Sequence, residues 1–192
     1  MSESLRPGRA FAVLAGLGFG VGPVLDGLHT WSGATWYGAP QFLKSVWWCP
    51  PLFCFAALAI GLGRLATERM INRPSPRPTP HTVAVSMSAF VLGYAASGFL
   101  PAPEATKAVL LFLAAVAVWW ALDRTLPGVL GALAAGFGGW LVEHTLVGQG
   151  LFFHRDVALD GVALWIPPLY FLAAIAIGHV ALISARAKAP GP

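Results

Sequence analysis

The sequence has few charged residues, which make up only 10% of its 192 positions. A soluble domain carries about 25% charged residues, so this composition cannot cover a water-exposed surface. The scarcity of charge excludes a free soluble enzyme and a disordered tail. It also argues against a nucleic-acid-binding module, because the 12 basic residues are scattered between apolar runs and form no patch. Hydrophobic residues make up 57% of the chain, and the mean hydropathy is +0.70. The sequence is therefore that of an integral membrane protein.

Cysteine is also scarce. Cys49 and Cys54 lie five residues apart on one expected helix, so they point in different directions and cannot form a disulfide with each other. We interpret both as small apolar packing residues. The sequence contains no CxxC and no paired Cys/His spacing, so it predicts no metal site and no cofactor.

The apolar runs are long enough for six transmembrane helices, since one crossing needs about 20 residues. We expect a single all-α polytopic domain over residues 1–192, with spans at about 10–29, 46–65, 82–100, 105–122, 128–148 and 162–184. Pro101 and Pro103 predict a tight turn between the third and fourth spans. Of the 12 Lys and Arg residues, all but Lys44, Lys107 and Arg155 lie on the side that carries both termini. This distribution predicts cytoplasmic termini.

The longest polar stretch, residues 64–81, contains the sequence RPSPRPTP from Arg73 to Pro80. Alternating prolines forbid a helix and favour an extended, polyproline-like segment. We interpret it as a cytoplasmic connection close to anionic headgroups. A docking ligand for a proline-reading domain is the alternative.

An internal repeat relates the first two spans to the last two. Residues 46–61 and 163–178 share nine of sixteen residues at a constant offset of 117, including Trp48 with Trp165 and a following pair of prolines in each copy. The copies begin four spans apart, so they have the same orientation, which predicts a parallel repeat about an axis near the membrane normal. We interpret each Trp as an interfacial anchor and each proline pair as a helix start. Shaping the mouth of a cavity is the alternative role.

Ionisable residues within the spans are the candidates for function, because they are costly in lipid. Asp26 and His29 lie one helical turn apart near the outer end of the first span, and the same offset carries Asp26 onto Glu143, which His144 follows. One interpretation is that these side chains reach the interface. A second is the polar end of a mostly apolar cavity for a lipid or sterol. A third is an acid/base pair or metal site in a membrane-embedded, lipid-modifying enzyme.

Further residues bear on these alternatives. Trp140, one turn before His144, and Gln149 would add polar groups to a lipid cavity on the fifth span. His179, near the cytoplasmic end of the last span, is interpreted as structural. The parallel repeat gives a small transporter some support as another functional class.

Three segments resemble the Insig (insulin-induced gene) family of polytopic membrane proteins. They are Ser45–Pro51 (SVWWCPP), Val118–Arg124 (VWWALDR) and Leu164–Pro168 (LWIPP). The family has similarly placed Ser-x-Trp-Trp-x-Pro-Pro, Trp-Trp-x-x-Asp-Arg and Ser-Trp-Leu-Pro segments. The resemblance implies a six-helix protein without enzymatic activity, which binds a sterol or related lipid and regulates a membrane-protein partner.

The resemblance also implies site residues. Asp123 matches the family aspartate needed for association with sterol-sensing partners. The family's lipid-facing positions fall near five residues, namely Phe90, Tyr94, Thr106, His144 and Gln149. Residues 151–160 depart from the family's Tyr-rich stretch, and the Arg- and Ala-rich composition indicates a GC-rich bacterial gene. We therefore expect a bacterial cell membrane in place of the endoplasmic reticulum of the animal family, and a ligand such as a diacylglycerol-like lipid.

Overall fold

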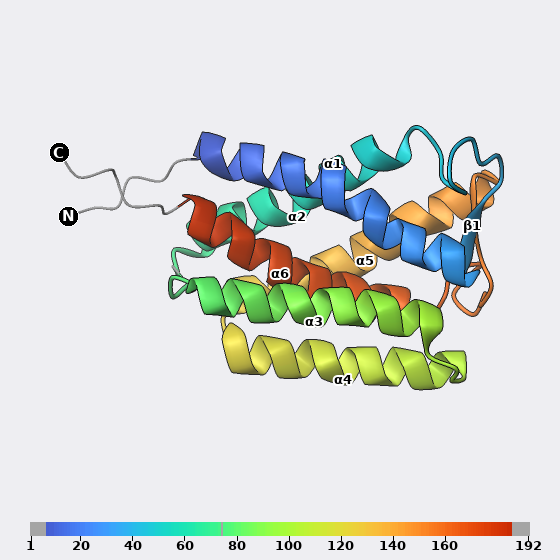
Figure 1. Ribbon diagram of the computed structural model, residues 1–192. Coiled ribbons are helices and arrows are strands. Elements are labelled where there is room, and N and C mark those ends of the chain that lie inside the picture. The colour runs from blue at the N-terminus through green and yellow to red at the C-terminus, as the bar shows by residue number, and fades with distance from the viewer. Residues whose placement is uncertain (1–6, 74, 186–192) are drawn as a thin grey trace.

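The computed structural model describes residues 7–73 and 75–185, and it confirms an all-α membrane fold. All six helices are long and apolar enough to cross a membrane. They are α1 (Pro7–Ser32), α2 (Cys49–Ile71), α3 (Pro80–Phe99), α4 (Glu104–Leu122), α5 (Leu126–Gly148) and α6 (Ile166–Ala185). Two short strands lie at one end of the bundle, β1 (Thr35–Tyr37) in the connection between α1 and α2 and β2 (Phe152–His154) in the connection between α5 and α6. We call this end of the bundle the sheet end and the opposite end, where the helical chain starts and finishes, the terminal end (Figure 1).

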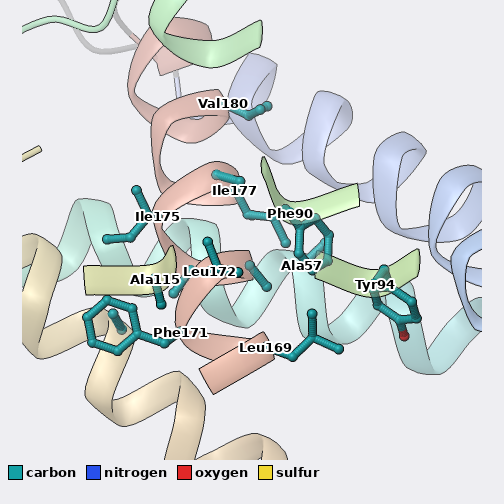
Figure 2. Close-up of a cluster of buried hydrophobic side chains, with 14 of the residues drawn as sticks. Ala57, Phe90, Tyr94, Ala115, Leu169, Phe171, Leu172, Ile175, Ile177 and Val180 are labelled. Carbon is teal, nitrogen blue, oxygen red and sulfur yellow. The ribbon is translucent and has the colours of Figure 1, made fainter. Parts of the chain in front are cut away.

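Helix α6 lies at the centre of the bundle, and the other five helices pack against it (Figure 1). Its membrane-spanning window is 83% buried, whereas α4 is only 17% buried and faces outward over most of its surface. The outward faces are nevertheless apolar, because lipid takes the place of water around them. Phe90 and Tyr94 of α3 lie on one side of α6, and Phe171 points to the other side, toward Ala115 of α4 (Figure 2).

Small residues let α1 approach α2 closely. A Cβ atom added to Gly18 would lie 2.8 Å from Ala57 Cβ and would also meet the backbone of Phe53. Only a glycine fits at this crossing, which is the usual device for helix packing where no hydrophobic effect drives association.

The helix ends follow local sequence signals. Pro50 and Pro51 occupy the first turn of α2, as predicted, because a missing N–H costs little there. The tight turn between α3 and α4 is confirmed, since α3 ends at Phe99 and α4 begins at Glu104. Helices α2 and α6 begin three or four residues later than predicted, at Cys49 and Ile166. The preceding apolar residues belong to turns, which hydropathy alone does not separate from a span.

The proline-rich connection lies against the bundle and does not hang free. Ser75 and Pro78 are buried, while the intervening Pro76 and Arg77 are exposed, which is the threefold spacing of a polyproline-like segment. Arg64 Nη2 donates a 2.7 Å hydrogen bond to Ser75 Oγ. This placement favours a structural connection over a docking ligand.

The antiparallel pair of β1 and β2 was not predicted. Thr35 pairs with His154, Trp36 with Phe153, and Tyr37 with Phe152. The first and last pairs turn inward and are buried, whereas Trp36 and Phe153 stack on the outer face with their ring centroids 5.8 Å apart. Each strand has only three residues, and their partners lie far apart in sequence, so no local pattern announces them.

The strands and the first residues of α2 and α6 correspond after the sequence offset of 117 is applied. The offset carries Thr35–Tyr37 onto Phe152–His154, and it carries Cys49 onto Ile166, the first residues of α2 and α6. Gly33 and Gly150, which both have positive φ values, are related in the same way. The parallel repeat as such stays a prediction, to which the structure adds this correspondence.

Candidate functional site

A cavity opens between α1, α2, α3, α5 and α6, with a volume of about 1010 Å³ including its mouth. Its walls are largely apolar along the middle of the helices, and they include Leu17, Leu52, Phe53, Ile60, Met87, Phe90, Leu146, Leu169 and Ile177. Its polar lining residues lie toward the sheet end, on the last turns of α1, α3 and α5, the first turns of α6, and the strands. The cavity therefore has a long apolar part and a short polar end.

Asp26 is one of two buried carboxylates at the polar end. The Tyr37 hydroxyl donates a 2.9 Å hydrogen bond to Asp26 Oδ2, and Cys49 Sγ lies 3.6 Å from the same oxygen. Burial, together with the neighbouring Asp26 charge, raises the pKa of the Tyr37 hydroxyl far above its ordinary value. Tyr37 therefore stays protonated and keeps donating to the carboxylate.

Glu143 is the second carboxylate, and it has a different type of partner. His154 Nε2 of β2 lies 2.8 Å from Glu143 Oε2, although the two groups are not aligned as a hydrogen bond. Tyr170 of α6 brings a hydroxyl close to the same carboxylate. A protonated His154 would form an ion pair with Glu143 across this distance.

His29 completes the polar end from α1. Its Nε2 atom lies 2.8 Å from Ser97 Oγ and 3.1 Å from the Tyr94 carbonyl oxygen, so a protonated Nε2 donates a hydrogen bond to an oxygen of α3. Its ring also stacks on Tyr94 with a centroid distance of 4.2 Å and meets the edge of Trp165. These contacts hold His29 in place as a wall residue.

Several buried polar atoms around this end have no hydrogen-bond partner in the described chain. They are Thr35 Oγ1, Trp165 Nε1, Glu143 Oε2 and both ring nitrogens of His154. Glu143 Oε2 and His154 Nε2 face each other at 2.8 Å. Buried polar groups are normally satisfied, so the other unpaired atoms call for a ligand or water. Thr35 and Glu143 line the cavity itself, and they can therefore reach a molecule inside it.

The structure divides the predicted lipid-binding residues into two sets. Asp26, His29, Phe90 and Tyr94 line the cavity. The first interpretation, that these side chains simply reach the interface, does not hold for Asp26, His29 and Glu143, because all three are buried. The charge-bearing groups instead receive their partners inside the protein.

The other predicted positions, Thr106, Trp140, His144 and Gln149, do not line the cavity. Trp140 Nε1 donates to the Leu159 carbonyl oxygen, and His144 Nδ1 lies 3.1 Å from the Asp160 carbonyl oxygen. Both rings thus support the loop after β2. Thr106 and Gln149 are exposed on the periphery. A role in lipid binding stays a prediction for these four, at a surface other than this cavity.

The four residues of the acid/base alternative do not all meet, since Asp26, His29 and Glu143 line the cavity and His144 lies outside it. Within residues 7–73 and 75–185, no group of three His, Cys, Asp or Glu side chains is placed to hold a metal ion. The remaining groups are engaged as described, Asp26 by Tyr37 and Glu143 by His154.

The interpretation of Trp48 and Trp165 as interfacial anchors is wrong. Trp165 is 1% exposed and packs between His29 and His154. Trp48 lines the cavity and meets the Tyr37 ring edge-on. The alternative, a role in shaping the mouth of a cavity, agrees with the position of Trp48, whereas Trp165 is not among the lining residues. The exposed member of the first segment is Trp47, the neighbour of Trp48.

Asp123 lies at the terminal end, far along the bundle from the cavity. Its carboxylate accepts hydrogen bonds of 2.8 and 3.0 Å from both terminal nitrogens of Arg64, and its side chain is 2% exposed. Arg64 also donates to Ser75 and Thr125, which ties the α2–α3 and α4–α5 connections to α2. His179, with its Nδ1 3.1 Å from Ser86 Oγ, packs beside this cluster in a structural position. The predicted association role of Asp123 stays a prediction.

Sequence reasoning missed Thr35, Tyr37, His154 and Tyr170. Loop and strand residues carry no periodic signal, and tyrosine within a span is usually a packing residue. The offset of 117 contains a usable signal, however, because it carries Asp26 onto Glu143 and Tyr37 onto His154. Each carboxylate thus has its partner eleven residues later in the chain.

Comparisons with known proteins agree with this architecture. Curated relatives are insulin-induced gene 1 proteins: that of Gallus gallus is 21% identical over 71% of this chain, and that of Xenopus laevis 22% identical over 71%. The matched stretch spans 55% of the length of both relatives. No family model matches the chain.

A solved structure covers nearly the whole chain. The mycobacterial Insig homologue MvINS from Mycobacterium vanbaalenii matches with a TM-score of 0.83 and 26% identity, over 97% of this chain and 98% of that one. A cross-linked trimer of MvINS matches equally well. The chain is an Insig homologue. This Insig homologue therefore shares the overall architecture of that crystal structure over nearly its whole length.

Proposed function

We propose that this Insig homologue binds one neutral, hydroxyl-bearing lipid, a sterol or a diacylglycerol-like molecule, in the cavity between its helices. The observation that carries the proposal is the division of the cavity into apolar walls and a polar end with unpaired buried atoms. The apolar walls extend along five helices and the polar groups gather at one end, which is the arrangement that an acyl-chain or sterol ligand requires. The head of the lipid points to the sheet end.

The charges at the polar end favour a neutral head. Asp26 and Glu143 both line the cavity, and the residues described around it include no Lys or Arg. A phosphate beside two carboxylates would meet like charges in a medium of low dielectric constant. A hydroxyl group, in contrast, donates to a carboxylate and accepts from Thr35.

We propose a regulatory and not a catalytic role, as the family resemblance implies. Asp123 then acts on a membrane-protein partner indirectly, through the loops that the Arg64 cluster holds, because its carboxylate is buried. The terminal end carries Arg9, Arg69, Arg73, Arg77 and Arg124, which supports a cytoplasmic location for it in a bacterial cell membrane. The cross-linked MvINS trimer makes a trimer the first oligomer to test.

The binding proposal is tested by lipid extraction and mass spectrometry on the protein purified in mild detergent. We expect one neutral lipid per chain. Ala56 lines the cavity, whereas Ala59, on the same helix, faces outward. Ala56→Phe fills the cavity and should remove the bound lipid, and Ala59→Phe should retain it.

Two outcomes would contradict the proposal. One is purified protein that carries no lipid and takes up neither cholesterol nor diacylglycerol from mixed micelles. The other is equal lipid content in the Ala56→Phe and Ala59→Phe variants. Chemical conversion of the bound lipid, lost in Glu143→Gln while the lipid is retained, would support a lipid-modifying enzyme instead.

A further inference from the structure

The connection between β1 and α2 contains a tight turn, which we call the Phe42 turn (residues 42–45). Phe42 and Ser45 exchange two backbone hydrogen bonds, Phe42 N to Ser45 O at 3.2 Å and Ser45 N to Phe42 O at 2.7 Å. The two central residues, Leu43 and Lys44, have φ values of 46° and 63°. A two-residue turn of this kind strongly favours Asn-Gly or Asp-Gly, because side chains with a Cβ are strained there.

A turn with the same backbone pattern lies 117 residues later and serves as an internal reference. Leu159 and Val162 form the same bridge, and the central residues Asp160 and Gly161 have φ values of 54° and 86°. Asp-Gly is the favoured chemistry for this conformation. Trp140 and His144 of α5 contact the carbonyl oxygens of this turn, so it packs against the protein.

The Phe42 turn differs from the reference turn in both chemistry and exposure. Phe42 is 74% exposed and Leu43 80% exposed at its tip, and Trp47, on the way to α2, is 74% exposed. A strained backbone that displays large apolar side chains is unfavourable in water. The sequence therefore places these side chains where an apolar medium receives them.

The position of the turn identifies that medium. The connection leads from β1 at the sheet end into α2 at the edge of the bundle (Figure 1). Phe55, in the second turn of α2, is also exposed. Trp is favoured at the headgroup level of a bilayer, and a lysine stem can lie along acyl chains while its ammonium reaches phosphate. Leu43, Lys44 and Trp47 have the chemistry of an interfacial anchor.

We propose that the Phe42 turn inserts into the bilayer leaflet at the sheet end. Phe42 and Leu43 lie among the upper acyl chains, and Lys44 pairs with lipid phosphate. The same connection joins Tyr37 to Trp48, and both of these line the cavity. Insertion of the turn thus holds the polar end of the cavity at a fixed depth below the headgroups.

The test places an environment-sensitive fluorophore at the tip of each turn. Leu43→Cys and, as the matched control, Asp160→Cys are made with Cys54→Ala, because Cys49 is buried and Cys54 is partly exposed. Each labelled protein is reconstituted into vesicles of phosphatidylcholine with a minor fraction of phosphatidylglycerol. Emission is quenched in turn by lipids with a doxyl group near the headgroup and by aqueous iodide.

We expect the label at position 43 to emit at shorter wavelength and to lose more emission to doxyl lipid than to iodide. The label at position 160 should show the reverse. Iodide quenching at position 43 as strong as at position 160 would overturn the proposal. Shielding of position 43 from both quenchers would also overturn it, because protein, such as a second copy of the chain, would then cover the turn. If the label at 43 lowers the melting temperature, Phe42→Cys provides a second position on the same tip.

Discussion

The buried ion pair between Arg64 and Asp123 allows a quantitative test of what holds the terminal end together. The two side chains are only 4% and 2% exposed, so solvent does not screen their interaction. Breaking a buried pair by removing one partner costs about 3–5 kcal/mol, because the other charge is left uncompensated. The two partners should differ within this range.

Arg64→Met should cost about 5 kcal/mol, near the upper limit for loss of a buried partner. This substitution removes the cation that serves two acids, since Glu68 Oε1 also lies 3.5 Å from Arg64 Nε. Asp123→Ala should cost about 3 kcal/mol, near the lower limit, because Arg64 retains Glu68, Ser75 and Thr125. The double variant should cost less than the sum of the two, by about 1–3 kcal/mol of coupling.

The free energy of unfolding can be measured by reversible denaturation in detergent micelles, followed by far-UV circular dichroism. Arg69→Met on the exposed face of α2 is the matched control and should change stability by less than about 0.5 kcal/mol. A cost for Asp123→Ala as small as that of Arg69→Met would refute the reasoning. So would strict additivity in the double variant, since the two side chains would then not be coupled.

Two further predictions concern the sheet end and the α1–α2 crossing. Because the pKa of Tyr37 is higher in the folded protein than the ordinary tyrosine value of about 10, the protonated hydroxyl stabilises the fold at pH values below about 10. This contribution is lost progressively as the pH rises above that value. The stability difference between the parent and Tyr37→Phe should therefore shrink between about pH 10 and pH 12, and a constant difference would contradict the assignment. Gly18→Ala should destabilise the protein by about 1–3 kcal/mol through overpacking, whereas Gly16→Ala, where the new Cβ meets no atom within 4 Å, should stabilise it by about 0.5–1 kcal/mol. Thermal melting in detergent would show opposite shifts for the two glycines, and shifts of equal sign would contradict the close approach of α1 and α2.

The spans could be predicted from sequence because lipid imposes one requirement on every crossing segment. The first residues of α2 and α6 could not be predicted, since residues 46–48 and 162–165, which precede them, are as apolar as the helices that follow. The strands escaped for a related reason. Their pairing is a long-range contact between residues more than 100 positions apart, and neither strand is long enough to show alternation.

The site could be predicted only where a charge stood inside a span. Asp26, His29 and Glu143 were identifiable because each is costly in lipid, and all three line the cavity. Their partners Tyr37 and His154 lie outside the spans, where polar residues are ordinary. Positions such as Trp140 and His144 have side chains of the expected types but point to the loop after β2, which helical periodicity alone does not reveal.

The few charges of the chain are used in two different ways at the two ends of the bundle. At the terminal end Arg64 satisfies Asp123 and approaches Glu68, and its remaining donors go to hydroxyl groups, so this cluster fixes loops and has little capacity for a ligand. At the sheet end, two carboxylates without a lysine or arginine beside them face a cavity, and polar atoms there remain unpaired. A buried carboxylate is tolerated on such terms only if donors reach it, and Tyr37 supplies one of them permanently. On the proposed function, the hydroxyl group of a lipid head would bring a further donor to this end.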